Sequence, residues 1–215
     1  MQKKLIKEAE LFVKTKLGKD ASGHDYHHCD RVRKLSIKIA IKEGIADTSV
    51  IELAALLHDV PDEKLNDGTE QGWKLLDEWF TGQEVPIQIS NQIKTIIQEV
   101  SYKGGHNSPP TSLEAEIVQD ADRLEAIGAI GIARAFAYGG KKGRPLFDPS
   151  ISVREEMTLE EYRNAKSSTI HHFYEKLLKL SALFNTKTGK EMAQKRHDYM
   201  ESFLEQFYKE WDAEV

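Results

Sequence analysis

Apolar residues recur at spacings of three and four along most of the chain, whereas strand-like alternation never lasts more than a few residues. This spacing places apolar side chains on one face of an α-helix, so the pattern predicts an all-α protein. In the first half of the chain, the first predicted helix should end at Gly18, because glycine is favoured just after a helix. The apolar stripes of this half lie in residues 5–17, 32–40, 51–58, 73–80 and 89–100.

Capping signals and turn residues predict the elements of the second half. Ser112 is a favourable N-cap and opens a predicted helix that continues to Gly139. Residues 139–153 are rich in glycine and proline and predict a long loop. Thr158 and Glu161 form a capping box, which predicts a helix from Thr158 to about Phe184. A final helix is predicted after residues 185–189, with its apolar stripe at Met192, Tyr199, Phe203 and Phe207.

Composition and charge narrow the classes of function. The chain has 215 residues, of which 40% are hydrophobic and 30% charged, with a net charge of -5, as in soluble globular proteins. Such an acidic chain has no general attraction for nucleic acid or an anionic membrane, and its longest uncharged stretch, Gly104–Leu113, is too short to span a bilayer. The N-terminus lacks the apolar segment of a secretory signal, so we expect a cytoplasmic protein with neither a nucleic acid nor a membrane as partner.

The histidines and the single cysteine indicate what kind of metal site the chain could build. Cys29 is the only cysteine, which excludes an intrachain disulfide and a cysteine-based zinc cluster. His58 and Asp59 stand together at the end of an apolar helix, and His28 and Asp122 lie on two other predicted helices. Two imidazoles and two carboxylates suit manganese, iron, zinc or magnesium and leave positions open for water. The set therefore favours a catalytic rather than a structural metal ion.

Three segments carry a resemblance to a known family. They are GHDYHHCDRV at residues 23–32, LAALLHDVPDEKL at residues 53–65 and VQDADRLEAIGAIGIARAF at residues 118–136. With them the chain resembles the HD-domain superfamily of metal-dependent phosphohydrolases, whose signature is H...HD...D. Residues 101–104 and 172–177 are similar to small bacterial HD proteins of the YedJ or YpgQ type, and the resemblance covers almost the whole chain. It implies one HD domain over residues 1–215, with a helical core at about 20–140 and a C-terminal helical extension at about 158–212.

The resemblance also implies four metal ligands, which map onto His28, His58, Asp59 and Asp122. The HxxRV pattern selects His28 over His27, and ADRL selects Asp122 over Asp120. Residues two apart on a helix differ by about 200° in direction, so only one of these two aspartates can face a given ion. Asp120 is then interpreted as a solvated or capping carboxylate. Glu125 shares the face of Asp122, either near the site or as a surface ion-pair partner.

Two acidic residues that follow the ligand pair are the candidate catalytic groups. Several HD hydrolases of pyrophosphate esters carry HDxxED, whereas this chain has HDVPDE, with the order of the two acids exchanged. Asp62 and Glu63 could therefore steer the attacking water, and the exchanged order leaves open which of them does so. The alternative is that both are exposed acids in the turn after Pro61.

Donors for a phosphate group must come from local cations because the chain is acidic overall. His24 and His27 could contact a leaving-group oxygen or a second metal. The alternatives are a solvated basic loop for residues 141–144 and packing roles for the histidines. The candidates for substrate binding are His27, Arg31, Lys103, Lys141, Arg144, His172 and Lys176.

The YpgQ-type resemblance implies hydrolysis of ribo- or deoxynucleoside triphosphates to monophosphate and pyrophosphate. The ion is expected to be Mn²⁺, with Mg²⁺, Fe²⁺, Ni²⁺ and Zn²⁺ as alternatives. Other functions with the same ligands are a nucleoside monophosphate phosphatase, a cyclic-nucleotide phosphodiesterase, and a non-catalytic module that binds metal or nucleotide. The expected partner is a small nucleotide or other phosphate ester, and the protein could be a monomer or a homodimer.

Overall fold

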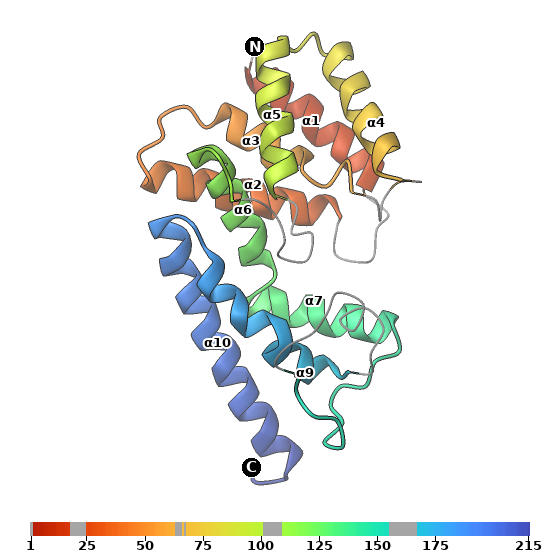
Figure 1. The fold of residues 1–215 in the computed structure, drawn as a ribbon, viewed down its shortest axis with the longest axis vertical. Coiled ribbons are helices and arrows are strands. Elements are labelled where there is room, and N and C mark those ends of the chain that lie inside the picture. The colour runs from red at the N-terminus through yellow and green to blue at the C-terminus, as the bar shows by residue number, and fades with distance from the viewer. Residues whose placement is uncertain (1, 18–24, 63–65, 67, 101–108, 155–166) are drawn as a thin grey trace. The chain divides into compact units, whose positions relative to one another are not determined.

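The fold is that of a computed structural model, which describes residues 2–17, 25–62, 66, 68–100, 109–154 and 167–215 (Figure 1). Every regular element in these ranges is helical, which confirms the all-α prediction. None of the described helices is both long and apolar enough to cross a bilayer. The chain forms two compact units, residues 1–122 and 123–215. The single domain with a core near residues 20–140 stays a prediction.

The first unit is built around a short apolar helix. Helix α3 is buried along most of its length and packs against α1, α2 and α5. A helix that is apolar on all sides is stable only in the interior, so α3 carries the residues at its C-terminal end into the core. The helices of this unit are α1 (Gln2–Leu17), α2 (Tyr26–Lys42), α3 (Ser49–Leu57), α4 (Thr69–Gly82), α5 (Ile87–Val100) and α6 (Leu113–Glu125), whose last three residues belong to the second unit.

The second unit contains a break that the sequence analysis did not predict. The single helix expected from Ser112 to Gly139 is wrong, because α6 ends at Glu125 and α7 begins at Gly128. Gly128 has a φ of 73°, a left-handed value that glycine adopts at little cost and that no α-helix continues through. The remaining elements of this unit are α7 (Gly128–Lys141), α9 (Thr169–His172), the π-helix η2 (Phe173–Leu177), the 3₁₀-helix η3 (Leu178–Leu183) and α10 (Lys187–Trp211).

A continuous helix from Thr158 to Phe184 is also wrong. Ser168 is extended, and its hydroxyl accepts a hydrogen bond from the backbone N–H of His171, so a helix begins at Thr169. From there to Leu183 the winding changes from α to π to 3₁₀. The predicted capping box at Thr158 and Glu161 lies outside the described residues.

The last helix begins earlier than expected, and one residue of its predicted apolar stripe is exposed. Thr186 is its N-cap and accepts a hydrogen bond from the backbone N–H of Gly189, within the segment that was expected to precede the helix. Its buried residues include Ala193, Met200 and Leu204, whereas Tyr199 of the predicted stripe is 54% exposed. The stripe is therefore wrong at Tyr199.

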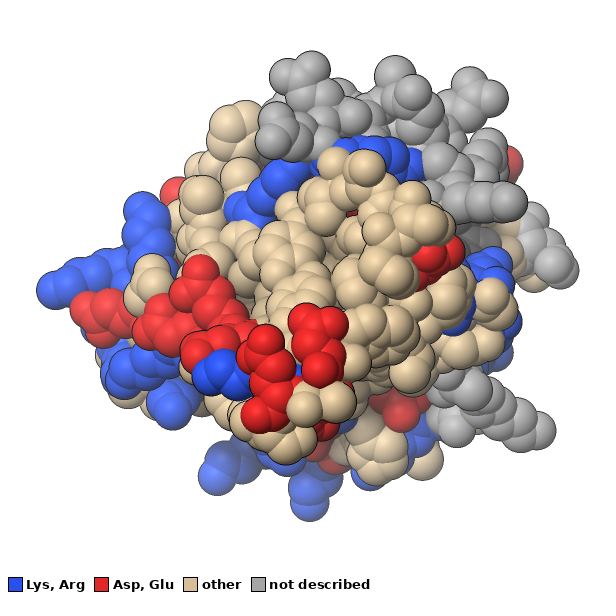
Figure 2. Space-filling view, turned by 90° about the horizontal axis from the view of Figure 1, so that it is seen from below, with Lys and Arg blue, Asp and Glu red and all other residues tan. Residues whose placement is uncertain are grey.

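The surface seen in Figure 2 carries both signs of charge. Acidic and basic side chains both surround an uncharged area, so this side of the molecule has no electrostatic field of a single sign.

The predicted loop is confirmed from residue 142 to residue 153, whereas its first three residues are helical because α7 continues to Lys141. Hydrogen bonds and ring contacts connect this loop to the rest of its unit. The backbone N–H groups of Thr169 and Ile170 donate to the carbonyls of Pro145 and Leu146 at 3.0 Å each. The ring of Phe147 packs against four rings from α9 and α10. These belong to His171, Phe207, Tyr208 and Trp211. The loop therefore holds its basic residues on a fixed backbone.

Candidate metal centre

The start of α2 positions His28 in the interior. Asp25 is the N-cap of this helix, and its Oδ1 accepts a hydrogen bond of 2.8 Å from the backbone N–H of His28. His28 is fully buried, on the same side of the helix as Val32. The sequence analysis missed Asp25, although an aspartate three residues before a histidine that opens a helix is a capping signal.

The end of α3 positions the second histidine and fixes its tautomer. His58 is the C-cap of α3, and its Nδ1 lies 2.8 Å from the carbonyl oxygen of Ala55. A carbonyl only accepts hydrogen bonds, so Nδ1 carries the hydrogen and Nε2 of the neutral ring is left with a lone pair. This nitrogen is buried and, among the residues that the structure describes, has no hydrogen-bond partner of good geometry.

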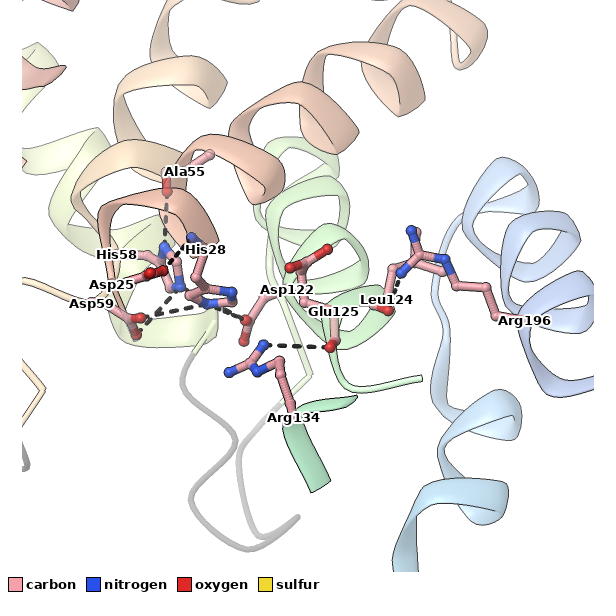
Figure 3. A network of polar contacts seen from close by, with 10 residues as sticks. All are labelled: Asp25, His28, Ala55, His58, Asp59, Asp122, Leu124, Glu125, Arg134 and Arg196. Atoms are coloured by element: carbon pink, nitrogen blue, oxygen red, sulfur yellow. Dashed lines mark hydrogen bonds and ion pairs between the residues drawn. The ribbon is translucent and has the colours of Figure 1, made fainter. Parts of the chain in front are cut away.

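Two imidazoles and two carboxylates from α2, the end of α3 and α6 converge in the first unit (Figure 3). Nε2 of His28 lies 3.4 Å from Oδ2 of Asp59 and 3.3 Å from Oδ1 of Asp122. Nε2 of His58 lies 3.3 Å from Oδ1 of Asp59 and 3.7 Å from Oδ1 of Asp122. The structure thus brings together the four residues that the sequence analysis named as ligands.

The spacing of these atoms fits a divalent ion. Ligand atoms about 2.1 Å from one ion lie roughly 3.0 to 3.4 Å apart when they are neighbours in octahedral or tetrahedral geometry. The four nitrogen–oxygen separations reach from 3.3 to 3.7 Å. His28, His58 and Asp59 also offer ligand atoms that all lie within 4.8 Å of one another. The cluster therefore suits a divalent metal.

The charges in the cluster stabilise one another strongly. Burial disfavours the charged form of His58, but the carboxylates of Asp59 and Asp122 outweigh burial and raise its pKa to about 9. Burial would raise the pKa of Asp122, but the imidazoles of His28 and His58 hold it well below the ordinary value. The side chain of Asp122 is 29% exposed against 9% for Asp59, so Asp122 is the more accessible carboxylate.

The burial of individual side chains decides between several alternatives that the sequence analysis gave for residues near these ligands. His27 is exposed while His28 is buried, which agrees with the choice of His28. Asp120 is fully buried, so its interpretation as a solvated carboxylate is wrong. Glu125 is 1% exposed, so the surface ion pair is wrong as well. Both lie on α6, whose helical turn points Asp120 and Asp122 in different directions.

The remaining candidates fall in three places. Glu63, Lys103 and His24 lie outside the described residues. Asp62 and Arg31 are half-buried in the first unit, and the backbone N–H of Asp62 donates to the carbonyl of Asp59 at 3.1 Å. Four belong to the second unit, which the sequence analysis did not separate from the first. These are Lys141, Arg144, His172 and Lys176.

Three of these four form a cationic group. Burial and then the charges of Lys176 and Arg144 together lower the pKa of His172 to about 4 against the opposing charge of Glu175, so its ring is neutral at pH 7. The guanidinium of Arg144 lies 5.7 Å from the centre of the Tyr138 ring. Lys141 is exposed at the end of α7.

Comparisons with known proteins place the chain in a family. The sequence profile of the HD domain matches residues 25–127. The chain is 36% identical to YpgQ of Bacillus subtilis over 212 residues, which cover 96% of this chain and 95% of YpgQ.

Solved structures agree with this match. A crystal structure described as an HD-superfamily hydrolase from Bacillus thuringiensis is 45% identical, with a TM-score of 0.80, and the match covers 99% of this chain and 100% of the other. The crystal structure of Bacillus subtilis YpgQ in complex with ADP has a TM-score of 0.76 at 32% identity, over 95% of this chain and 97% of the other. The chain therefore belongs to the HD-domain family of metal-dependent phosphohydrolases.

Proposed function

We propose that this protein is a nucleotide pyrophosphohydrolase that cleaves ribo- or deoxynucleoside triphosphates to monophosphate and pyrophosphate. The observation that carries the proposal is the buried convergence of His28, His58, Asp59 and Asp122, which suits an open, hydrolytic metal site. The similarity to YpgQ, whose crystal structure contains ADP, supports a nucleotide as substrate. Mn²⁺ is the proposed ion, and Mg²⁺, Fe²⁺, Ni²⁺ and Zn²⁺ are the alternatives that the same donors accept.

Several residues of the chain have distinct roles in the proposed reaction. When bound, a divalent ion supplies Lewis acidity toward a phosphoryl oxygen and toward water. The hydrogen bond from Nδ1 of His58 to Ala55 keeps Nε2 directed at the cluster. Asp62, three residues after Asp59, is proposed to orient the water and accept its proton, with Glu63 as the alternative. The water oxygen bonds to the α-phosphorus while the bond from that phosphorus to the bridging oxygen breaks, and pyrophosphate leaves.

Product analysis tests the proposal directly. Metal-free protein is reloaded with Mn²⁺, incubated with ribo- and deoxynucleoside tri-, di- and monophosphates and cyclic nucleotides, quenched with chelator and separated by chromatography. We expect triphosphates to yield monophosphate and pyrophosphate, with turnover lost on chelation and recovered on adding Mn²⁺. Release of nucleoside from monophosphates would instead identify a phosphatase, and opening of cyclic nucleotides a phosphodiesterase. Confirmed Mn²⁺ binding without any turnover would favour the non-catalytic module.

Substitution tests the prediction that Arg144 and Lys176 contribute to substrate binding. Arg144→Ala and Lys176→Ala should each raise KM about tenfold and change kcat less, because a charge-assisted hydrogen bond to phosphate acts already in the bound ground state. Steady-state kinetics with the best triphosphate measure both constants. Lys195→Ala removes an exposed lysine from α10 and serves as the control. Unchanged KM in both variants would remove these two residues from the binding site.

A further inference from the structure

The turn that follows α3 contains the ligand Asp59 and Asp62, the residue proposed to orient the water. The side chain of Asn66, which lies outside the family motif, is hydrogen-bonded to this turn. We call residues 58–62 the HD turn. The side-chain amide of Asn66 donates two hydrogen bonds of 2.8 Å, one to the carbonyl of Val60 and one to the carbonyl of Asp62. One amide group thereby fixes two peptide units, and these units follow Asp59 on both sides of Pro61.

A glycine of α4 lies directly against the same turn. A Cβ atom added at Gly72 would lie 2.6 Å from Cα and 3.0 Å from the carbonyl carbon of Pro61, and 2.8 Å from Nδ2 of Asn66. Carbon atoms in contact are normally 3.5 to 4.0 Å apart, and the atoms of Pro61 are backbone, which no side-chain rotation can move. Gly72 is buried and helical, so its role here is the close approach of two backbones.

Helix α4 also contacts other helices of the first unit through its own side chains. Trp79 stacks on Phe12 of α1 with ring centres 5.6 Å apart. Leu76 and Phe80 are buried, and Asp77 pairs with Lys94 of α5 at 2.9 Å. A methyl group at position 72 would therefore press against the backbone of Pro61 and the residues joined to it.

We propose that Gly72 and Asn66 are positioning residues of the metal centre. They hold the HD turn so that the carboxylate of Asp59 faces the imidazoles of His28 and His58, with Asp62 close behind it along the chain. This inference rests on the proposed function, because it takes Asp59 as a ligand. It adds two residues that act on the ligands through backbone contacts and touch neither metal nor substrate.

The first test compares two glycines of the same helix. Gly72→Ala should weaken Mn²⁺ binding, measured by titration calorimetry on the metal-free full chain, by at least about tenfold, as outer-shell changes commonly do. Gly82→Ala makes the same chemical change where nothing lies within 4 Å of the new Cβ, and it should leave Mn²⁺ affinity unchanged. A Gly72→Ala protein that melts at a lower temperature but binds Mn²⁺ like the wild type would overturn the proposal.

The second test uses Asn66 and does not depend on the folding of the glycine variant. Asn66→Ala removes both hydrogen-bond donors, whereas Asn66→Asp places an acceptor against two carbonyl oxygens. Mn²⁺ affinity and kcat should therefore fall in both variants, and more in Asn66→Asp than in Asn66→Ala. KM at saturating Mn²⁺ should stay nearly constant. Asn91→Ala, at an exposed position of α5, is the control. Wild-type affinity and kcat in both Asn66 variants would contradict the role of Asn66. If the wild type itself bound no Mn²⁺, the proposed function would fail instead.

Discussion

Asp59→Asn should abolish Mn²⁺-dependent hydrolysis while leaving the helical fold intact. Asp59 is 6% exposed, and its two oxygens lie 3.4 and 3.3 Å from Nε2 of His28 and His58. Asparagine keeps the shape of the side chain but removes the negative charge that a divalent ion needs. We expect kcat/KM to fall about a thousandfold or more, the order reported for the loss of a group that stabilises charge in the transition state.

Three measurements on the same samples decide this prediction. Chromatography gives the turnover, titration calorimetry gives the Mn²⁺ affinity, and circular dichroism shows whether the helices are retained. Asp212→Asn removes an exposed carboxylate at the end of α10 and should behave like the wild type. Normal Mn²⁺-dependent turnover in Asp59→Asn would show that the ion is held elsewhere.

The helices that the sequence predicted well are those in which periodicity and burial agree. In α3 the apolar run is continuous, and in α5 the stripe of Ile93, Ile96, Ile97 and Val100 is buried as expected. Periodicity predicted the wrong helix bounds where the backbone conformation or the capping side chain of a single residue ends or starts a helix. The apolar pattern continues through Gly128, yet the left-handed backbone of this glycine separates α6 from α7, and the N-cap Ser168 starts a helix inside the one predicted from Thr158.

The ligands could be predicted because they form a motif, whereas the residues that position them could not. His58 and Asp59 are adjacent in the sequence at the end of a buried helix, and this is visible without a structure. Gly72 contributes by lacking a side chain next to Pro61, eleven positions earlier in the chain. Glycine occurs in helices for many reasons, so only the distance between the two backbones identifies its role.

A second residue with a large expected effect is Arg33, which joins three helices of the first unit. Its guanidinium donates to Glu10 of α1 and Asp30 of α2 at 2.6 Å each, and to Glu52 of α3 at 3.2 Å. The Arg33 side chain is 16% exposed. Burial would raise the pKa of Asp30, but hydrogen bonds from Lys34 and Arg33 hold it below the ordinary value, whereas burial raises the pKa of Glu52 despite the charge of Arg33.

Arg33→Leu should lower the free energy of unfolding by about 2 to 4 kcal/mol at pH 7, because it leaves three partly buried carboxylates close together without their shared cation. Lys34→Leu is the matched control, since Lys34 also pairs with Asp30 but is 66% exposed, and it should cost less than about 0.5 kcal/mol. Urea unfolding followed by circular dichroism measures both.

The difference between the two proteins should also depend on pH. The stabilisation that Asp30 gains from its lowered pKa is complete above about pH 4 and is lost as the pH falls through that lowered pKa. The difference in free energy of unfolding between wild type and Arg33→Leu should therefore become smaller in acid. Equal losses in the two variants, or a difference that widens in acid, would show that Arg33 does not stabilise the unit through these carboxylates.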